Sequence, residues 1–304
     1  MHLLFFLQSL LTLNGEDKMK TTESTLGYNG IWYKGIRVLL CTFIPLYLYT
    51  FTSCEEVIDV DLNSAESKLV IEGAITDQPG PYTVKISKTT DYYIPADYPK
   101  ISGAVITISD NSGFIEHLTE TEPGVYQTDS LVGIPGRTYS LKVVLEGKNY
   151  TAQSTMPLPL EIDSLTYEED AHNFGDDKLY NVLCNFQDAS GYRNFARLKV
   201  YQNNDIVNNI FLFNDRLLDG NYIRNRIRYQ FDPNDKVMVE LWSIEEATYT
   251  YYSTMKNAIA ADAESPFNSS IPANPVSNIS GLSSDGVLGY FGAFTVRTDS
   301  VIIN

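Results

Sequence analysis

Short runs of alternating apolar and polar residues, each followed by a turn signal, restrict the fold of this sequence more than any other feature. Residues 82–87 alternate in this way, and residues 103–109 form a second run that ends in an Asp-Asn-Ser-Gly turn at 110–113. Residues 114–119 follow as the partner strand of a hairpin. A side-chain period of two is that of a strand with one buried face. The pattern therefore predicts a mainly β protein.

The first half of this β pattern has the strand spacing of a sandwich. Further short strands are expected at residues 68–73, 124–128, 139–145 and 150–155. About six or seven strands within roughly 90 residues are typical of an immunoglobulin-sized domain. The sequence lacks the Cys–Trp–Cys core of antibody domains. We therefore predict an amino-terminal immunoglobulin-like β-sandwich over residues 68–156 that is not a true antibody domain.

A proline-rich segment at 156–160 (Met-Pro-Leu-Pro-Leu) marks the boundary with a second β-rich region. Two prolines at this spacing stiffen a crossover. The strands expected beyond it cover residues 162–168, 179–187, 195–202, 206–213, 222–230, 236–242 and 286–296. Glycines in the last of these strands permit a bulge or close approach by another backbone. We predict a second antiparallel β domain over residues 157–304, and the pattern leaves a sandwich and a partial barrel both open.

The period of the sequence changes to that of a helix after residue 242. Ser243 and Glu246 have the spacing of a capping box, in which Ser243 is the N-cap. Apolar residues then recur at every third or fourth position, at Ile244, Ala247, Tyr251, Met255 and Ala258. This spacing predicts one helix over residues 243–261 with a single buried face. Tyr249, Tyr251 and Tyr252 are core anchors in this interpretation, with ligand contact as the alternative.

The amino-terminal segment has the layout of a secretory signal. Lys34 and Arg37 precede the hydrophobic run 38–51, and the small polar residues Thr52 and Ser53 close it before Cys54. This arrangement resembles a bacterial lipobox, although Phe51 replaces the usual leucine. We predict a signal peptide over residues 1–53, starting at Met1 or Met19, and lipid attachment at Cys54. The alternative is a short anchoring helix with an incidental cysteine.

The other cysteines do not offer Cys54 a partner. Cys41 lies inside the segment predicted to be removed, and Cys184 falls on the same strand face as Val182 and Phe186. We therefore expect Cys184 to be a small core residue and the mature chain to have no disulfide. Residues 54–67 read as an acidic tether.

The order of several short motifs resembles the Bacteroidota outer-membrane lipoproteins of domain-of-unknown-function family 4249. The motifs are Leu-Val-Ile-Glu-Gly at 69–73, the strand 103–109, Gly-Val-Tyr at 124–126, Pro-Gly-Arg-Thr-Tyr at 135–139, Asn-Ile at 278–279 and Gly-Tyr-Phe-Gly-Ala at 289–293. The resemblance implies an outer-membrane lipoprotein, often encoded beside a TonB-dependent transporter, without established catalytic residues. Glu55 and Glu56 resemble the surface-export signal of Bacteroidota lipoproteins, and their alternative role is to solvate the tether.

The charge and the motifs of the sequence disfavour several classes of function. The sequence has 22 basic against 38 acidic residues, a net charge of −16, which disfavours binding to nucleic acid. Its histidines are His2, His117 and His172, and no metal-ligand or nucleophile motif surrounds them. We therefore predict no catalytic residue, no metal and no cofactor. The acidic loop 168–177 is a solvated loop in this interpretation, with calcium binding as the alternative.

Two further sets of residues are candidate surface sites. Tyr92, Tyr93 and Tyr98 lie in a proline-containing loop, where tyrosines either contact a ligand or pack onto their own domain. Ser130, Ser164 and Ser300 follow aspartate and precede an apolar residue, which resembles a Bacteroidota O-glycosylation acceptor.

These observations together favour a non-enzymatic, lipid-anchored protein of the outer membrane and cell surface. Its expected role is accessory to a TonB-dependent transporter, in capture or uptake of a ligand. The alternatives are a surface glycan hydrolase and an adhesin or envelope-structural protein.

Overall fold

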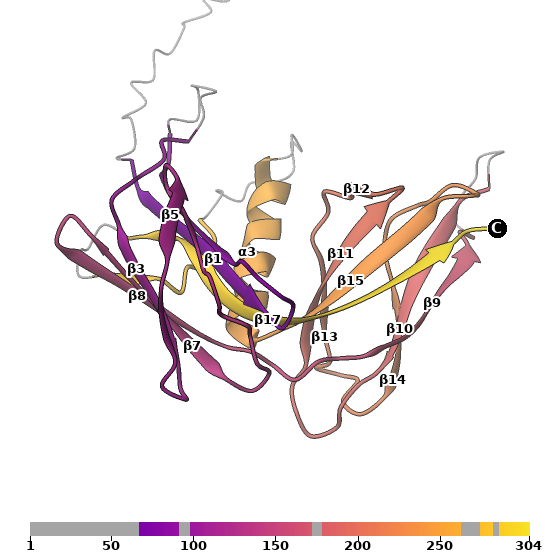
Figure 1. Ribbon diagram of the computed structural model, residues 1–304. Helices are drawn as coiled ribbons and strands as arrows, with labels where there is room; N and C mark the ends of the chain where they lie inside the picture. Colours follow the sequence, from indigo (N-terminus) through magenta and orange to yellow (C-terminus); the bar gives the residue numbers. More distant parts are fainter. Residues whose placement is uncertain (1–66, 91–97, 172–177, 263–273, 282–285) are drawn as a thin grey trace, which may run out of the picture. The chain divides into compact units, whose positions relative to one another are not determined.

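The alternating segments form strands, and the class of the fold is mainly β, as predicted. The computed structural model describes residues 67–90, 98–171, 178–262, 274–281 and 286–304 (Figure 1). These residues form three sheets and one α-helix, α3 (Glu246–Asp262). Among the described residues, no helix is both long and apolar enough to cross a membrane.

The largest sheet has nine strands among the described residues, in the order β12-β11-β15-β17-β1-β2-β6-β5, with β13 on β11. The bounds of its strands are β1 (Leu69–Thr76), β2 (Thr83–Lys88), β5 (Thr119–Glu122), β6 (Val125–Gln127), β11 (Phe195–Gln202), β12 (Asp205–Ile206), β13 (Phe211–Asn214), β15 (Lys236–Ile244) and β17 (Leu288–Ile302). Both halves of the chain contribute strands to this sheet.

Two smaller sheets complete the described architecture. The five-stranded sheet has the order β16-β8-β7-β3-β4, and the three-stranded sheet has the order β14-β10-β9. The bounds of their strands are β3 (Val105–Asp110), β4 (Ile115–His117), β7 (Thr138–Leu145), β8 (Lys148–Thr155), β9 (Ile162–Glu169), β10 (Tyr180–Gln187), β14 (Tyr222–Arg226) and β16 (Ser280–Gly281). The predicted hairpin is confirmed, because Ser109 pairs with Ile115 across the turn at 110–113.

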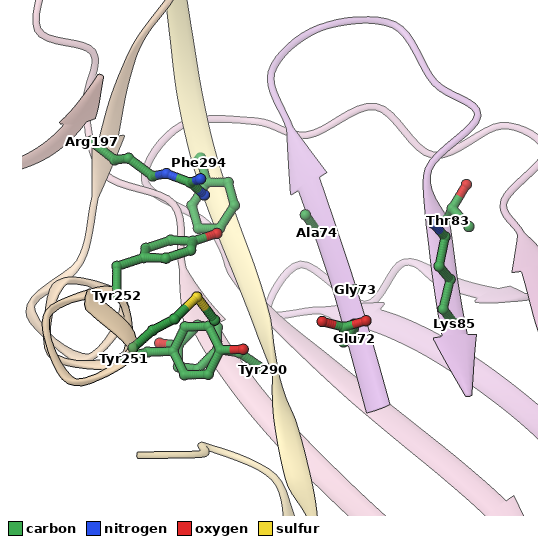
Figure 2. Close-up of a pocket in the computed structure, with 11 residues that line it drawn as sticks. Glu72, Gly73, Ala74, Thr83, Lys85, Arg197, Tyr251, Tyr252, Tyr290 and Phe294 are labelled. Carbon is green, nitrogen blue, oxygen red and sulfur yellow. The ribbon is translucent and has the colours of Figure 1, made fainter. Parts of the chain in front are cut away.

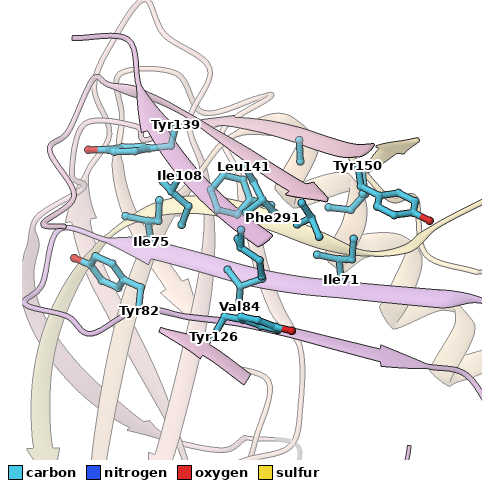
Figure 3. Close-up of a cluster of buried hydrophobic side chains, with 14 of the residues drawn as sticks. Ile71, Ile75, Tyr82, Val84, Ile108, Tyr126, Tyr139, Leu141, Tyr150 and Phe291 are labelled. Atoms are coloured by element: carbon cyan, nitrogen blue, oxygen red, sulfur yellow. The ribbon is translucent and has the colours of Figure 1, made fainter. Parts of the chain in front are cut away.

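The first core lies between the five-stranded sheet and the β1, β2 and β6 part of the large sheet. It buries Ile71, Val84 and Phe291 against Ile108 and Leu141, among others (Figure 3). Every second residue of these strands points into it, so the alternating pattern of the sequence is the cause of the packing.

The second core lies between the three-stranded sheet and the β11 and β15 part of the large sheet. Val182, Cys184 and Phe186 of β10 are buried there against Leu198 and Leu241. Cys184 is therefore the core residue that the sequence predicts. Burial raises the pKa of its thiol to about 12, with a smaller contribution from the charge of Asp299. At neutral pH the thiol is protonated and unreactive.

Strand β17 joins the two parts of the large sheet. Its residues 288–294 pair in parallel with β1, and its residues 295–302 pair antiparallel with β15. Figure 1 shows this strand passing from β1 to β15 beside α3. The glycines predicted to permit close backbone approach do so at Gly289, where an added Cβ would lie 2.0 Å from the carbonyl oxygen of Ile71.

The helix covers the opposite face of the large sheet where β17 changes partner. Phe294 and Ile244 are buried there, with Trp242 and Tyr249 packed against them. The faces of β17 are thus buried on one side by a sandwich core and on the other by α3. A pocket lies beside this contact.

Several local predictions differ from the structure. The strand expected at 222–230 ends at Arg226, and the one expected at 114–119 is β4 alone up to His117. Ser243 lies in β15 and its hydroxyl accepts a hydrogen bond from the Leu160 amide at 2.9 Å, so the helix begins at Glu246 and the predicted capping box is wrong. The single strand expected at 206–213 is two strands, β12 and β13. The last strand continues past residue 296 to Ile302, because β15 offers it a further partner edge.

The boundary predicted at Met156–Leu160 stays a prediction. Met156 is buried in the first core and Leu160 in the second. The segment between β8 and β9 therefore carries one anchor for each core.

Candidate functional site: the α3 pocket

A pocket of about 380 Å³ lies between α3 and the outer face of the large sheet (Figure 2). We call it the α3 pocket. Its lining comes from five elements: Tyr251, Tyr252 and Met255 of α3, Glu72, Gly73 and Ala74 of β1, Thr83 and Lys85 of β2, Arg197 of β11, and Tyr290 and Phe294 of β17. Its size is that of a small-molecule site.

One wall of the α3 pocket is aromatic. The Tyr251 ring stacks on Tyr290 with centroids 4.7 Å apart, and it meets Tyr252 edge to face at 5.3 Å. The Tyr290 hydroxyl accepts a hydrogen bond from the Thr248 hydroxyl at 3.0 Å. These contacts fix the rings of the helix against the sheet, so the wall is preformed.

The buried phenols of this wall are not acid–base groups at neutral pH. Burial, aided by the charge of Glu72, raises the pKa of Tyr251 to about 12. Burial also raises the pKa of Tyr290 far above its ordinary value. Both hydroxyls therefore remain protonated and serve as hydrogen-bonding groups.

Arg197 is the cation on the helix side of the pocket. Its neighbours Ala196 and Leu198 are buried in the second core, so alternation along β11 directs Arg197 to the opposite face. Its guanidinium carbon lies 4.0 Å from the Tyr252 ring centroid and 5.6 Å from that of Trp242. The guanidinium is thus held by cation–π contacts.

The polar groups of Arg197 have no partner in the part of the chain that the structure describes. Its Nε is buried without a hydrogen bond, and no described carboxylate lies within 4.0 Å of its nitrogens. An unpaired buried donor costs about 1–3 kcal/mol. The terminal nitrogens of Arg197 are not buried in this way and make no hydrogen bond to a described residue, so they are the donors that a ligand with an acceptor group could reach.

The far side of the α3 pocket carries two opposite charges. Glu72 and Lys85 are exposed and face each other as register partners of β1 and β2. Figure 2 shows Arg197 across the pocket from both. The lining therefore has one more positive than negative charge, in a chain whose net charge is −16.

Cations and aromatic rings continue along the same face of the sheet. The Lys199 ammonium lies 4.7 Å from the Trp242 ring centroid and 3.6 Å from a Glu240 carboxylate oxygen. Lys199 therefore has the carboxylate partner that Arg197 lacks.

A second cluster, outside the α3 pocket, has the oxygen ligands that hard cations prefer. Carboxylate oxygens of Asp188, Asp215 and Asp219 all lie within 4.8 Å of one another, and the first two side chains are buried. Burial and then the charges of Asp215 and Asp219 raise the pKa of Asp188. These are the described residues that could hold Ca²⁺.

The aspartate cluster is nevertheless held by protein donors. The Asn194 side-chain amide donates to Asp188 at 3.0 Å, and the Asn194 backbone N–H donates to Asp215 at 2.7 Å. We assign no metal to it. The sequence signal for this cluster is the Asp-x-x-x-Asp-Gly stretch at 215–220, which is too short to indicate a site by itself.

The tyrosine loop predicted as a contact surface is described only at Tyr98, which is 66 % exposed and does not line the α3 pocket. Tyr92 and Tyr93 lie outside the described residues, as do Cys54, Glu55 and Glu56 and the His172 part of the acidic loop. His117 is exposed, and its Nδ1 lies 3.1 Å from the Thr107 hydroxyl.

The three serines differ in their surroundings. Ser300 and Ser130 are both exposed. The Ser130 hydroxyl donates a hydrogen bond to the Glu116 carboxylate at 3.3 Å. Ser164 is half-buried in β9 and accepts a hydrogen bond from the Asn185 side-chain amide at 3.2 Å. O-glycosylation at these positions stays a prediction.

The α3 pocket itself was not predicted. Tyr251 is buried as the expected core anchor, while Tyr252 lines the pocket and is half-buried. The available signal was a pair of cations, Arg197 and Lys199, in the otherwise apolar run 195–200, and the sequence does not distinguish between them. The aromatic neighbours of Arg197 come from another part of the sequence, so only the fold brings them together.

Comparison with protein families matches residues 55–300 to a Domain of unknown function (DUF4249). A comparison with curated proteins gave no match. The family match covers most of the chain, including the strands and the helix that line the α3 pocket. The chain therefore belongs to the DUF4249 family.

Proposed function

We propose that this chain is a lipid-anchored protein of the outer-membrane surface that captures a ligand and delivers it to a TonB-dependent transporter. The observation that carries the proposal is the α3 pocket, in which aromatic rings lie beside an arginine that has no carboxylate partner among the described residues. Such a lining holds a ligand through stacking and charge.

The chemistry of the lining supports binding over catalysis. The described residues of the α3 pocket include no histidine, cysteine or serine, and the pKa values of Tyr251 and Tyr290 are raised away from neutral pH. A general base needs a pKa near the working pH. Glu72 and Lys85 are ionisable too, but they are exposed on the far side of the pocket, and in our proposal the protein binds a ligand and is not an enzyme.

The anchor in this proposal is the acylated Cys54, with Glu55 and Glu56 as the signal for surface export. Acyl chains hold a protein at a membrane without a spanning helix. The acidic tether 54–67 would separate the folded part from the lipid surface. A surface glycan hydrolase and an adhesin or envelope-structural protein remain the alternatives, and no described feature favours either of them.

Extraction of outer membranes with a mild detergent, followed by affinity purification of this chain, tests the proposal. We expect a large TonB-dependent transporter to copurify in near-stoichiometric amount. The matched control is Cys54→Ala, which should leave the chain unacylated by mass spectrometry and release it from the membrane fraction. Recovery of an acylated chain without a transporter would contradict the accessory role, and an unmodified wild-type Cys54 would contradict the anchor.

A further inference from the structure

We propose that the α3 pocket selects a small molecule with a carboxylate joined to a flat apolar group, and that Arg197 binds the carboxylate. The inference rests on the proposed function, because it names the ligand class of the same pocket. It also assigns Arg197 as the residue that determines specificity.

The orientation of Arg197 leaves its hydrogen-bonding edge for a ligand. Its guanidinium carbon lies 4.0 Å from the Tyr252 ring centroid, so this ring occupies one side of the group. The five N–H groups of a guanidinium form a fork that matches the two oxygens of a carboxylate. The contact with Tyr252 therefore restrains this fork before any ligand arrives.

The other two cations of this part of the sheet have carboxylate partners, whereas Arg197 has none among the described residues. Arg193 pairs with Glu246 at 3.0 Å, and Lys199 pairs with Glu240 at 3.6 Å. Both side chains lie on the same strand or beside it. Among the described residues, Arg197 has an aromatic support and a pocket, but no carboxylate.

The aromatic wall specifies the rest of the ligand. Tyr251, Tyr252, Tyr290 and Phe294 present rings within one pocket of about 380 Å³. Rings of this kind stack on flat apolar groups and exclude water from the neighbouring ion pair. Glu72, on the opposite side, would repel a ligand with a second anionic group there.

Isothermal calorimetry with matched acid and amide probes tests the proposal on the intact mature chain. The pairs are naphthalene-2-carboxylate and its carboxamide, indole-3-acetate and indole-3-acetamide, and N-acetyltyrosine and N-acetyltyrosinamide. We expect at least one acid to bind about tenfold more tightly than its amide, as a hydrogen-bonded charge implies. Equal binding of acid and amide in every pair, or binding by no acid, would overturn the proposal.

Variants of Arg197 test whether this residue causes the preference for acids over amides. Arg197→Gln should reduce the acid-to-amide ratio to near one, and Arg197→Lys should leave an intermediate ratio because the charge remains without the fork. Lys199→Gln is the matched control, a cation of the same strand outside the pocket lining, and should keep the wild-type ratio. If Arg197→Gln does not fold, the ratio in Arg197→Lys decides, and an unchanged ratio there would overturn the assignment.

The result is separable from that of the proposed function. If the wild-type chain shows no preference for acids but a transporter copurifies with it, only the proposed ligand class is overturned. A clear acid preference without a copurifying transporter would retain the ligand class and contradict the accessory role.

Discussion

Gly289 shows how one residue without a side chain permits the pairing of β1 with β17. Its φ is +95°, and an added Cβ would lie 2.0 Å from the Ile71 carbonyl oxygen. Backbone in this region is strained for any residue with a Cβ. Both the conformation and the close approach therefore require glycine.

Gly289→Ala should lower the free energy of unfolding by at least about 3 kcal/mol, since strain and a backbone clash add. Urea denaturation followed by circular dichroism measures the change. Gly136→Ala is the matched control: φ there is +82° and nothing lies within 4 Å of the added Cβ. It should cost about 1–2 kcal/mol. Equal losses in the two variants would show that the approach to Ile71 is not a constraint.

Asp110 gives the stability a defined dependence on pH. Burial alone would raise its pKa, but hydrogen bonds from Ser112, Phe114 and Arg137 lower it from 3.8 to about 2. The folded state therefore binds this proton less readily than the unfolded state. The stability that the Asp110 carboxylate contributes is fully present above the pKa of the unfolded state, and it is lost as the pH falls through the pKa of the folded state.

The Asp110 carboxylate should contribute about 2 kcal/mol at neutral pH, and the contribution should disappear between about pH 4 and about pH 2. Urea midpoints measured across this range test the prediction. Asp110→Asn should flatten the dependence, whereas Asp205→Asn, which changes an exposed carboxylate of β12, is the control. An unchanged slope in Asp110→Asn would contradict the assignment.

Sequence patterns predict residues whose role depends on one strand. Cys184 is such a residue, because alternation within β10 is enough to place it in the core. Arg197 is not, because its role depends on Tyr252 of α3 and on the absence of a described carboxylate partner. The role of Arg197 therefore depends on the fold and not on its local sequence.

At the scale of elements, Glu245 fixes the start of α3 to β8. Its carboxylate accepts hydrogen bonds from the Ser154 hydroxyl at 2.6 Å and the Thr155 amide at 3.1 Å, and its carbonyl accepts the Tyr249 amide at 3.0 Å. The Ser154 hydroxyl oxygen in turn accepts the Ala293 amide of β17 at 2.9 Å. This network joins the helix, β8 and β17 beside the α3 pocket.

Glu245→Ala should destabilise the fold by about 2 kcal/mol, because the buried Ser154 hydroxyl loses its acceptor. Its neighbour Glu246 offers a matched control, since its ion pair with Arg193 is exposed on both sides. Glu246→Ala should change stability by less than about 0.5 kcal/mol. Thermal unfolding of both variants tests the difference, and similar losses would argue against the network.

The predicted helix exists, but its start was predicted from a local motif that the fold does not use. Ser243 pairs with Thr295 of β17 in the sheet, so β15 continues where the capping box was expected. Tyr251 is buried as predicted, but Thr248 is buried in place of Ala247, which is exposed. Strand pairing with a distant segment overrides a local capping signal, and no local pattern contains that information.

At the scale of the molecule, β17 makes the two cores depend on each other. Phe291 is buried in the first core, Ile303 just after the strand is buried in the second, and Phe294 packs beneath α3. Arg297 adds a link, with its guanidinium 2.6 Å from Asp77 and 2.8 Å from Glu161. Loss of either core would remove pairing partners of the other.

We therefore expect one cooperative unfolding transition for residues 67–304. Hydrogen exchange with mass spectrometry, in increasing urea, should show peptides of β7 and β10 losing protection at the same midpoint. Two separate midpoints would instead indicate domains that fold independently on either side of residues 156–160.

The β class and most strand positions could be predicted from alternation, because each strand carries its own period. The continuous large sheet could not be predicted in this way, because it depends on the parallel pairing of β1 with β17, two strands at opposite ends of the described chain. The α3 pocket depends on that pairing and on the helix that covers it. Its existence is therefore a property of the whole molecule.

A crystal structure of the protein with naphthalene-2-carboxylate tests the central claim most directly. We expect the carboxylate oxygens at about 2.7–2.9 Å from the Arg197 guanidinium nitrogens, with the ring system against the tyrosines of the α3 pocket. A ligand bound elsewhere, or one in the pocket with its carboxylate directed away from Arg197, would contradict the account.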